Sequence, residues 1–415
     1  MKQFPKDFLW GAGASSHQVE GNTNNNWTAW ERDNSERLSR EAKIRWDKWQ
    51  QEKFPEMLDV RNYISGATCD HYNRFIEDFN LAKAGGHTAH RFSIEWSRVE
   101  PEEGRFDERE IEHYRKVLTA LRERGIESFV TLWHWTEPIW FEQNGGWESK
   151  KSADYFCRYV EKMANSLGDL VNFWIVINEP NVVVKFGYLI GTQPPGKKSL
   201  VSFLKTYFNL LKSYKKSYEL IHSLNKDAKV GFANSFVCYE SDIFKPLDKI
   251  IVSIAKYFSR YFFKQTKGFN DFIGCNYYSR SLISLKKKGF SSDQRTDLGW
   301  EIYPKGIYEV LKEIKKYNLP IYITENGLAD ADDSKRERFI KDHLFWVRSA
   351  IEEGVNVRGY FYWSLMDNFE FPEDRGFWPR FGLIEIDFQT LKRKPRKSFY
   401  VYREIISIQS RSILN

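Results

Sequence analysis

Two glutamates each stand at the end of a run of apolar and β-branched residues. Glu179 directly follows the stretch FWIVIN, and Glu325 lies near the end of IYITEN, ahead of Gly327. A carboxylate at the end of a buried strand is costly unless another group pairs with it or uses it. Cleavage of a glycosidic bond requires two carboxyl groups in one pocket, one to protonate the leaving oxygen and one to act at the anomeric carbon. The pair therefore indicates glycoside chemistry, with a structural ion pair as the alternative for each glutamate.

The elements that must position these glutamates recur as a unit of a short apolar run, a polar loop and a helical pattern. Eight such runs are the expected strands, at residues 7–13, 88–94, 127–133, 172–178, 229–235, 271–277, 321–326 and 359–365. Several lack polar alternation, as expected for parallel strands that are buried on both faces. Eight β-then-α units predict an α/β fold, a single (β/α)8 or TIM barrel with extended βα loops that fills residues 1–415. Residues 22–66 are polar and charged, and we expect them to form an extended loop over one face.

The active site of such a barrel forms at the carboxyl ends of the strands. The polar and aromatic residues expected there, besides the two glutamates, are His17, Gln18, Glu20, Arg91, Glu95, Trp96, His134, Trp135, Glu137, Asn178, Asn276, Tyr278, Trp363, Asp367, Asn368 and Glu370. They predict a ring of carboxylates, amides, an imidazole and indoles that converges on one mouth. Arg91 and Tyr278 can supply the cation and the hydroxyl donor that an ionised Glu325 needs. Glu179, as an acid, should lie in a less polar setting or near another negative charge.

Seven stretches together resemble glycoside hydrolase family 1, the β-glucosidase and β-glycosidase family. They are FLWGAGASSHQVEG, RFSIEWSRV, TLWHWTEPIW, WIVINEPN, DFIGCNYYS, YITENG and YFYWSLMDNFE followed by RFGL, in the family's order. The resemblance implies a retaining, exo-acting β-glycosidase without a cofactor, which acts on terminal β-glucosyl residues and also on β-galactosides and β-fucosides. It implies that Glu179 is the general acid/base and Glu325 the nucleophile.

The same resemblance assigns the residues that hold the substrate. The non-reducing sugar contacts Gln18, His134, Trp135, Asn178 and Glu370; Trp363 forms the floor beneath it; Arg91, Asn276 and Tyr278 surround the nucleophile; and Trp300 lies on the leaving-group side. Phe371 stands where the family usually has Trp, so one N–H donor to a sugar hydroxyl is missing, which is worth about 0.5–1.5 kcal/mol. Thr136 and Glu137 replace the usual Asp-Leu. Both differences leave the preference among gluco, galacto, fuco and manno sugars open, and the natural aglycone cannot be read from the sequence.

Three other functions can be compared with the sequence. The subgroup that cleaves 6-phosphorylated sugars is disfavoured because a carboxylate at Glu370 would repel phosphate. A metal-dependent barrel enzyme and a catalytically silent sugar-binding protein are the remaining alternatives. The four cysteines are widely spaced without a C-x-x-C, which argues against a zinc site or a disulfide framework. We expect no metal.

Charge and hydropathy set the expected partners. The net charge is +7, but the basic runs are short and scattered, so they indicate a solvated surface and no nucleic acid. No apolar run is long enough to span a membrane, and the N-terminus lacks an apolar signal region, so a cytoplasmic location is expected. KIIVSIAKYFSRYFFK (249–264) is a basic amphipathic helix that could pack on the core, the favoured interpretation, or lie on a membrane surface. The expected ligands are small-molecule β-glycosides or short oligosaccharides, and homo-oligomerisation is left open.

Overall fold

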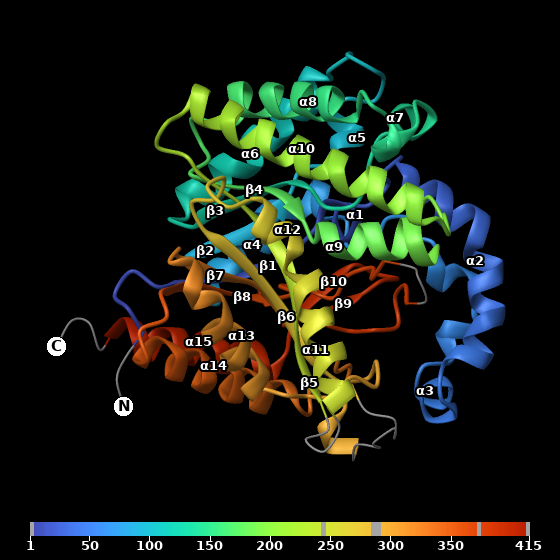
Figure 1. Cartoon of the computed structure of the whole chain (residues 1–415). Helices are drawn as coiled ribbons and strands as arrows, with labels where there is room; N and C mark the ends of the chain where they lie inside the picture. Colours follow the sequence, from blue (N-terminus) through green and yellow to red (C-terminus); the bar gives the residue numbers. More distant parts are fainter. Residues whose placement is uncertain (1–3, 242–245, 284–291, 372–374, 412–415) are drawn as a thin grey trace.

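The computed structural model describes residues 4–241, 246–283, 292–371 and 375–411. Eight parallel strands close into a barrel in the order of the sequence, with β1 paired to both β2 and β8 (Figure 1). The strands are β1 (Leu9–Gly13), β2 (Ala89–Ser93), β3 (Glu127–Trp133), β4 (Phe173–Asn178), β5 (Lys229–Ser241), β6 (Ile273–Ile283), β7 (Ile321–Asn326) and β8 (Val357–Trp363). The predicted α/β barrel is confirmed, and each expected strand overlaps an observed one.

The strands lack polar alternation because both of their faces are buried. Phe129 on β3 points into the barrel, where its ring lies 4.7 Å from that of Phe361 on β8 and 5.0 Å from that of Tyr322 on β7. The next residue, Val130, belongs to the separate cluster formed with the surrounding helices. Alternate side chains thus fill the barrel and the layer outside it, and both environments select apolar residues.

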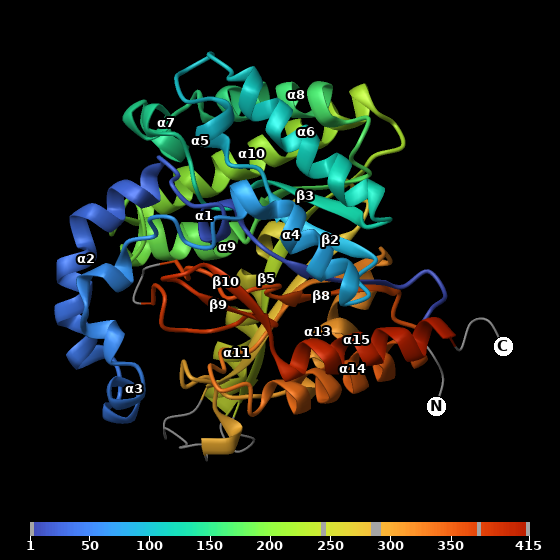
Figure 2. The ribbon, with the colours of Figure 1, turned by 180° about the vertical axis from the view of Figure 1, so that it is seen from behind.

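Helices follow the strands and surround the barrel. They are α4 (His71–Ala84), α6 (Glu108–Glu123), α8 (Ser152–Leu167), α10 (Leu200–Leu224), α11 (Pro246–Ser259), α12 (Tyr261–Gln265), α13 (Lys305–Ile314), α14 (Arg336–Glu352) and α15 (Lys397–Arg411). Helices α13, α14 and α15 pack side by side, with both chain ends nearby (Figure 2). None of the described helices is long and apolar enough to cross a bilayer.

The expectation of an extended loop at residues 22–66 is wrong. This segment forms α2 (Asn26–Arg45), α3 (Lys48–Lys53) and two 3-10 turns, Pro55–Leu58 and Val60–Tyr63, which run along one edge of the molecule in both views (Figures 1 and 2). The buried stripe of α2 repeats at helical spacing but mixes polar with apolar residues, as in Trp27, Glu31, Ser35 and Leu38. A search for apolar periodicity therefore passes over it.

Strands β5 and β6 extend beyond their predicted ends at residues 235 and 277. Past the barrel, the segments 238–241 and 280–283 continue to pair in parallel as a half-buried arm. Arg280 in this arm forms an ion pair with Glu240 at 2.8 Å. The arm mixes polar and apolar residues, unlike the strands of the barrel. The predicted ends of β5 and β6 therefore lie before the observed ones.

Candidate active site

A cavity of about 260 Å³ opens at the carboxyl ends of the strands. At about 30 Å³ per water molecule, it has room for roughly nine waters, which is enough for a six-membered sugar ring. Most of the predicted site residues line it: Gln18, His134, Trp135, Asn178, Glu179, Tyr278, Trp300, Glu325, Trp363, Glu370 and Phe371. Two more, Arg91 and Asn276, are fully buried and hydrogen bond to the cavity residues from behind. His17, Trp96 and Asn368, also expected at the mouth, are buried and do not line the cavity.

The carboxylate of Glu325 accepts two strong hydrogen bonds. Arg91 Nη1 donates to Oε1 at 2.6 Å, and the Tyr278 hydroxyl donates to Oε2 at 2.7 Å. Burial and the negative charge of Glu325 raise the pKa of Tyr278 well above its ordinary value, so the hydroxyl keeps its proton and remains a donor. A cation and a hydroxyl donor both stabilise a charged carboxylate. Both contacts favour the charged form of Glu325 at the end of β7.

Glu179 lies in a different electrostatic environment. It follows β4 with a φ of +48°, in the left-handed region that non-glycine residues seldom occupy. Asn276 Nδ2 donates to its Oε1 at 2.9 Å. Burial, and next the negative charge of Glu325, raise the pKa of Glu179 to about 8. The surroundings of Glu179 thus favour its protonated form, whereas the contacts of Glu325 favour its charged form, and the two carboxyl groups share one cavity.

Asn178 connects the two carboxyl groups to the sugar side of the cavity. Its Oδ1 accepts from Arg91 Nη2 at 2.7 Å and from Asn276 Nδ2 at 3.2 Å. Its Nδ2 lies 3.1 Å from Nε2 of His134 and, since Oδ1 is the acceptor, donates to that nitrogen. Burial and the charge of Arg91 hold the pKa of His134 well below its ordinary value, so the ring is neutral. Among the described residues, its Nδ1 has no hydrogen-bond partner.

Glu370 and Phe371 lie together at the far side of the cavity. Trp363 Nε1 approaches Glu370 Oε1 at 3.4 Å, and burial raises the pKa of Glu370 to about 7. The ring of Phe371 packs 4.6 Å from Trp27 and 4.7 Å from Trp135. The phenyl ring therefore fills an aromatic box that includes α2, the element that the sequence pattern missed.

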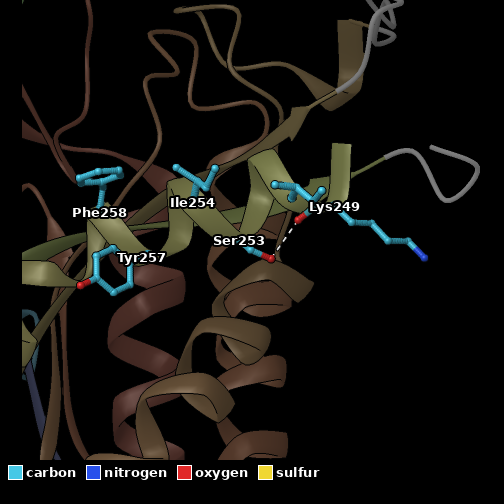
Figure 3. A pocket seen from close by; sticks show the side chains of 6 residues that line it. Lys249, Ser253, Ile254, Tyr257 and Phe258 are labelled. Atoms are coloured by element: carbon cyan, nitrogen blue, oxygen red, sulfur yellow. Dashed lines mark hydrogen bonds between the residues drawn. The ribbon is translucent and has the colours of Figure 1, made fainter. Parts of the chain in front are cut away.

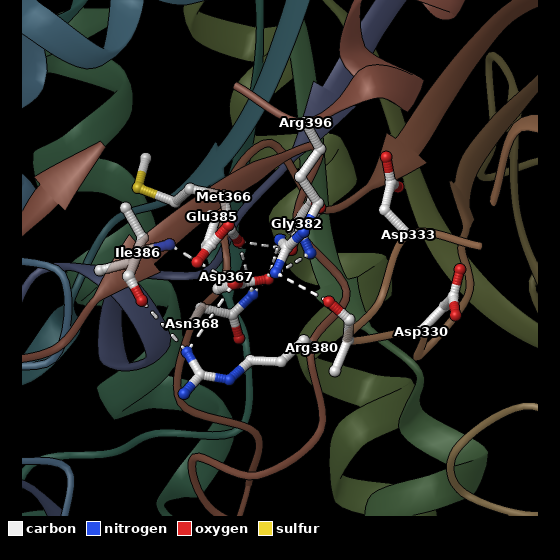
Figure 4. A network of polar contacts seen from close by, with 12 residues as sticks. Asp330, Asp333, Met366, Asp367, Asn368, Arg380, Gly382, Glu385, Ile386 and Arg396 are labelled. Carbon is white, nitrogen blue, oxygen red and sulfur yellow. Dashed lines mark hydrogen bonds and ion pairs between the residues drawn. The ribbon is translucent and has the colours of Figure 1, made fainter. Parts of the chain in front are cut away.

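Several carboxylates predicted at the mouth lie elsewhere. Asp367 is fully buried, does not line the cavity, and forms ion pairs with Arg396 at 2.8 Å and Arg380 at 3.7 Å, while the Gly382 amide donates to it at 2.9 Å (Figure 4). It ties the segment that carries Glu370 to the hairpin of β9 (Ile384–Asp387) and β10 (Lys392–Pro395). The prediction that Asp367 belongs to the mouth is wrong.

Glu20, Glu95 and Glu137 are also buried outside the cavity. Glu20 pairs with Arg98 at 2.8 Å, and Glu95 accepts from the hydroxyls of Ser16 and Thr136, each at 2.9 Å. These partners come from the segments that follow β1, β2 and β3, so Glu20 and Glu95 hold these segments to each other rather than face a ligand.

The sequence did not single out every residue of the cavity. Its further lining residues are Val182, Phe186, Ser235, Phe236, Val237, Ser279, Arg375 and Phe381. Phe186 belongs to η4, a π-helix (Val184–Ile190) that follows the short helix α9 (Pro180–Val183). An apolar residue gives no signal of function by its type alone. Only the position of Phe236 and Val237 near the end of a barrel strand could have identified these two residues.

An eight-stranded parallel barrel with two buried glutamates in one sugar-sized cavity at the carboxyl ends of its strands has the architecture of the barrel glycoside hydrolases. The family model described as glycosyl hydrolase family 1 matches residues 1–250 and 239–411, and the chain belongs to this family. The resemblance found in the sequence is thereby confirmed, and the protein is a glycoside hydrolase.

Named relatives cover nearly the whole chain. β-Glucosidase A of Thermotoga maritima is 33% identical, over 98% of this chain and 98% of that protein. The structure of a β-glycosidase from Pyrococcus horikoshii is 38% identical with a TM-score of 0.87, over 98% of this chain and 95% of that one. The β-glucosidase of Thermotoga maritima in complex with glucoimidazole is 30% identical with a TM-score of 0.85, over 99% and 100% of the two chains.

Replacing Asp367 tests whether this residue positions Glu370 from outside the cavity. Asp367→Asn leaves the buried Arg396 without its counter-charge, so we expect the free energy of unfolding to fall by about 3–5 kcal/mol. We also expect KM to rise more than kcat falls, because the Glu370 segment loses its anchor. Chemical denaturation and steady-state kinetics measure the two effects.

The matched control is Asp169→Asn. Asp169 pairs with Arg115 at 2.9 Å, but its side chain is 60% exposed, so the loss should be about 0–1 kcal/mol with unchanged kinetics. Equal destabilisation by the two substitutions would contradict the anchoring role of Asp367.

Proposed function

We propose that the protein is a retaining, exo-acting β-glycosidase that removes terminal non-reducing β-D-glycosyl residues through a covalent glycosyl-enzyme intermediate. The observation that carries the proposal is the contrast between two carboxyl groups in one cavity. Glu325 accepts from Arg91 and Tyr278, whereas burial and the charge of Glu325 raise the pKa of Glu179 to about 8. Double displacement needs this pair, an ionised nucleophile and a protonated acid.

In the first step, a carboxylate oxygen of Glu325 forms a bond to the anomeric carbon. The bond from that carbon to the leaving oxygen breaks, and this oxygen takes the proton of Glu179. In the second step, the now ionised Glu179 removes a proton from water, whose oxygen attacks the anomeric carbon and releases Glu325. Two inversions at one carbon return the β-anomer. Another acceptor hydroxyl in place of water gives glycosyl transfer.

The other cavity residues bind the sugar. Asn178 is placed for the 2-hydroxyl, a contact that strengthens in the transition state, while Gln18, His134 and Glu370 serve the outer hydroxyls. Trp363 offers its indole face to the apolar face of the pyranose, and Trp300 lies on the leaving-group side. Relatives are named β-glucosidase and, in Pyrococcus woesei, β-galactosidase. We propose β-glucosides as substrates, with β-galactosides and β-fucosides also accepted, and a reaction in the cytoplasm that uses no cofactor.

Substitution of each glutamate separates their roles. Glu325→Ala should abolish turnover of every substrate. Glu179→Ala should lower kcat/KM by about 10²–10⁴ for aryl β-glucosides with poor leaving groups but far less for acidic phenols, because those need little protonation. The measurement is kcat/KM across a series of phenols of graded acidity, with ¹H NMR of the first sugar released. Equal losses across the series would contradict the role assignment, and first release of the α-anomer would contradict retention.

The charge of Glu325 should be visible in the titration of Glu179. Glu325→Gln removes the negative charge that disfavours a second anion, so the pKa of Glu179 should fall from about 8, yet stay above its ordinary value because burial is the larger cause. ¹³C NMR of labelled glutamate measures this value in both proteins. In the unsubstituted enzyme, kcat/KM should decline as the pH rises through about 8, where Glu179 loses its proton.

Glu404→Gln, on an exposed helix position, is the control and should leave the titration of Glu179 unchanged. A Glu179 titration that is the same with and without the charge at position 325 would show that the two carboxyl groups do not act on each other.

A further inference from the structure

Helix α11 exposes a row of large apolar side chains. It packs against β5, as the favoured interpretation of this amphipathic segment predicts. Its opposite face is open, with Ile250 exposed to 56%, Ile254 to 50% and Phe258 to 65%. Ile254 and Phe258 project from the same side of the helix (Figure 3). Packing on the core therefore accounts for only one of the two apolar faces of this helix.

The first half of α10 carries further exposed apolar side chains. Ring contacts connect α11 to this helix through Tyr261 of α12, from Tyr257 to Tyr261 at 5.4 Å and from Tyr261 to the buried Tyr207 at 5.7 Å, and Tyr207 lies 5.6 Å from Phe208. Phe208 is 55% exposed, and Leu204, one turn before it on α10, is 44% exposed. We call the surface formed by Leu204, Phe208 and the exposed residues of α11 the apolar face. Large apolar patches on a protein surface mark interaction sites.

Lysines are frequent around the apolar face. Residues 180–218, which include η4 and most of α10, contain seven lysines and no Asp or Glu, and residues 249–270 are also free of acids. Two of the seven, Lys197 and Lys216, pair with Glu148 and Asp154 from other elements, and five remain beside the face. Lys249 and Lys205 are exposed, and Lys264 Nζ lies 4.1 Å from the ring centroid of Tyr257. Lysines with apolar stems beside aromatic rings suit the boundary between lipid acyl chains and head groups.

The apolar face reaches toward the rim of the active site through η4. Phe186 of this π-helix lines the cavity, whereas Leu189, three residues later, is 40% exposed. The amide of Ser199 donates to the carbonyl of Tyr188 at 2.9 Å, which places the start of α10 beside this exposed end of η4. A surface bound to the apolar face would therefore lie close to the mouth of the cavity.

We propose that the apolar face docks reversibly on an anionic lipid surface. Its apolar side chains would enter the interface while the surrounding lysines contact anionic head groups. A second copy of the chain fits less well, because a twofold contact would bring the same positive patches together. The complementary charge of an anionic bilayer favours the lipid as the occupant.

Vesicle sedimentation tests the proposal with the full-length protein. We expect co-sedimentation with vesicles of phosphatidylcholine and phosphatidylglycerol in equal parts, little with phosphatidylcholine alone, and release as salt is added. The triple substitution Ile250→Ser, Ile254→Ser and Phe258→Ser should lower the partition coefficient at least about tenfold. The pair Lys249→Glu and Lys264→Glu should lower it by a similar factor.

Matched controls sit on other faces. Ile44→Ser with Phe345→Ser removes apolar side chains that are 90% and 50% exposed on α2 and α14, and Lys226→Glu reverses an exposed charge. These variants should bind vesicles like the unsubstituted protein. All variants should keep the same kcat on a water-soluble aryl β-glucoside, which shows that they fold.

Three outcomes would overturn the proposal. They are absence of binding to the anionic vesicles, equal loss of binding in the control variants, and sedimentation equilibrium that shows a dimer which the triple substitution dissociates without any vesicle binding. The last outcome would assign the apolar face to a second copy of the chain.

Discussion

The buried guanidinium of Arg91 connects strands of the barrel with the carboxylate of Glu325. From β2 it donates to Thr131 on β3 at 3.2 Å, to Asn178 on β4 at 2.7 Å and to Glu325 on β7 at 2.6 Å. A charge with no exposure to solvent costs several kcal/mol unless it is paired and fully hydrogen bonded. Its partners come from distant parts of the sequence and meet only when the barrel is closed. The same closure that compensates this charge therefore assembles the reactive carboxylate.

The position of that one cation makes two identical side chains chemically different. Glu325 takes a direct bond from Arg91, whereas Glu179 takes one from the neutral amide of Asn276. Burial then acts on Glu179 without a contacting counter-charge, and the anion beside it adds to the effect, so its pKa rises to about 8. The acid and the anion thus depend on each other, because the charge held at Glu325 helps to keep the proton on Glu179.

Local sequence could identify the strands and the two glutamates because each signal lies within a few residues. It could not separate Glu370 from Asp367, two carboxylates three residues apart after the same strand. Asp367 is buried because it pairs with Arg380 and Arg396, which flank a hairpin later in the sequence. Helix α2 was not predicted for a related reason. Glu31 is buried because it contacts His17 at 2.8 Å and Ser65 at 2.7 Å. These two residues lie before and after the helix, so the residue pattern within the helix does not reveal that Glu31 is buried.

The exposed isoleucine and phenylalanine side chains of the apolar face also promote association between copies of a chain. The lysines around the face act against this association and also favour binding to lipid. Like charges disfavour contact between two copies of this face, and the same charges favour its proposed contact with an anionic surface. The π-helix η4 places this surface next to the reaction, because Phe186 faces the cavity and Leu189 faces outward. A glycoside with an apolar aglycone that is held in a bilayer would then reach Glu179 with its sugar first and its leaving group toward the lipid.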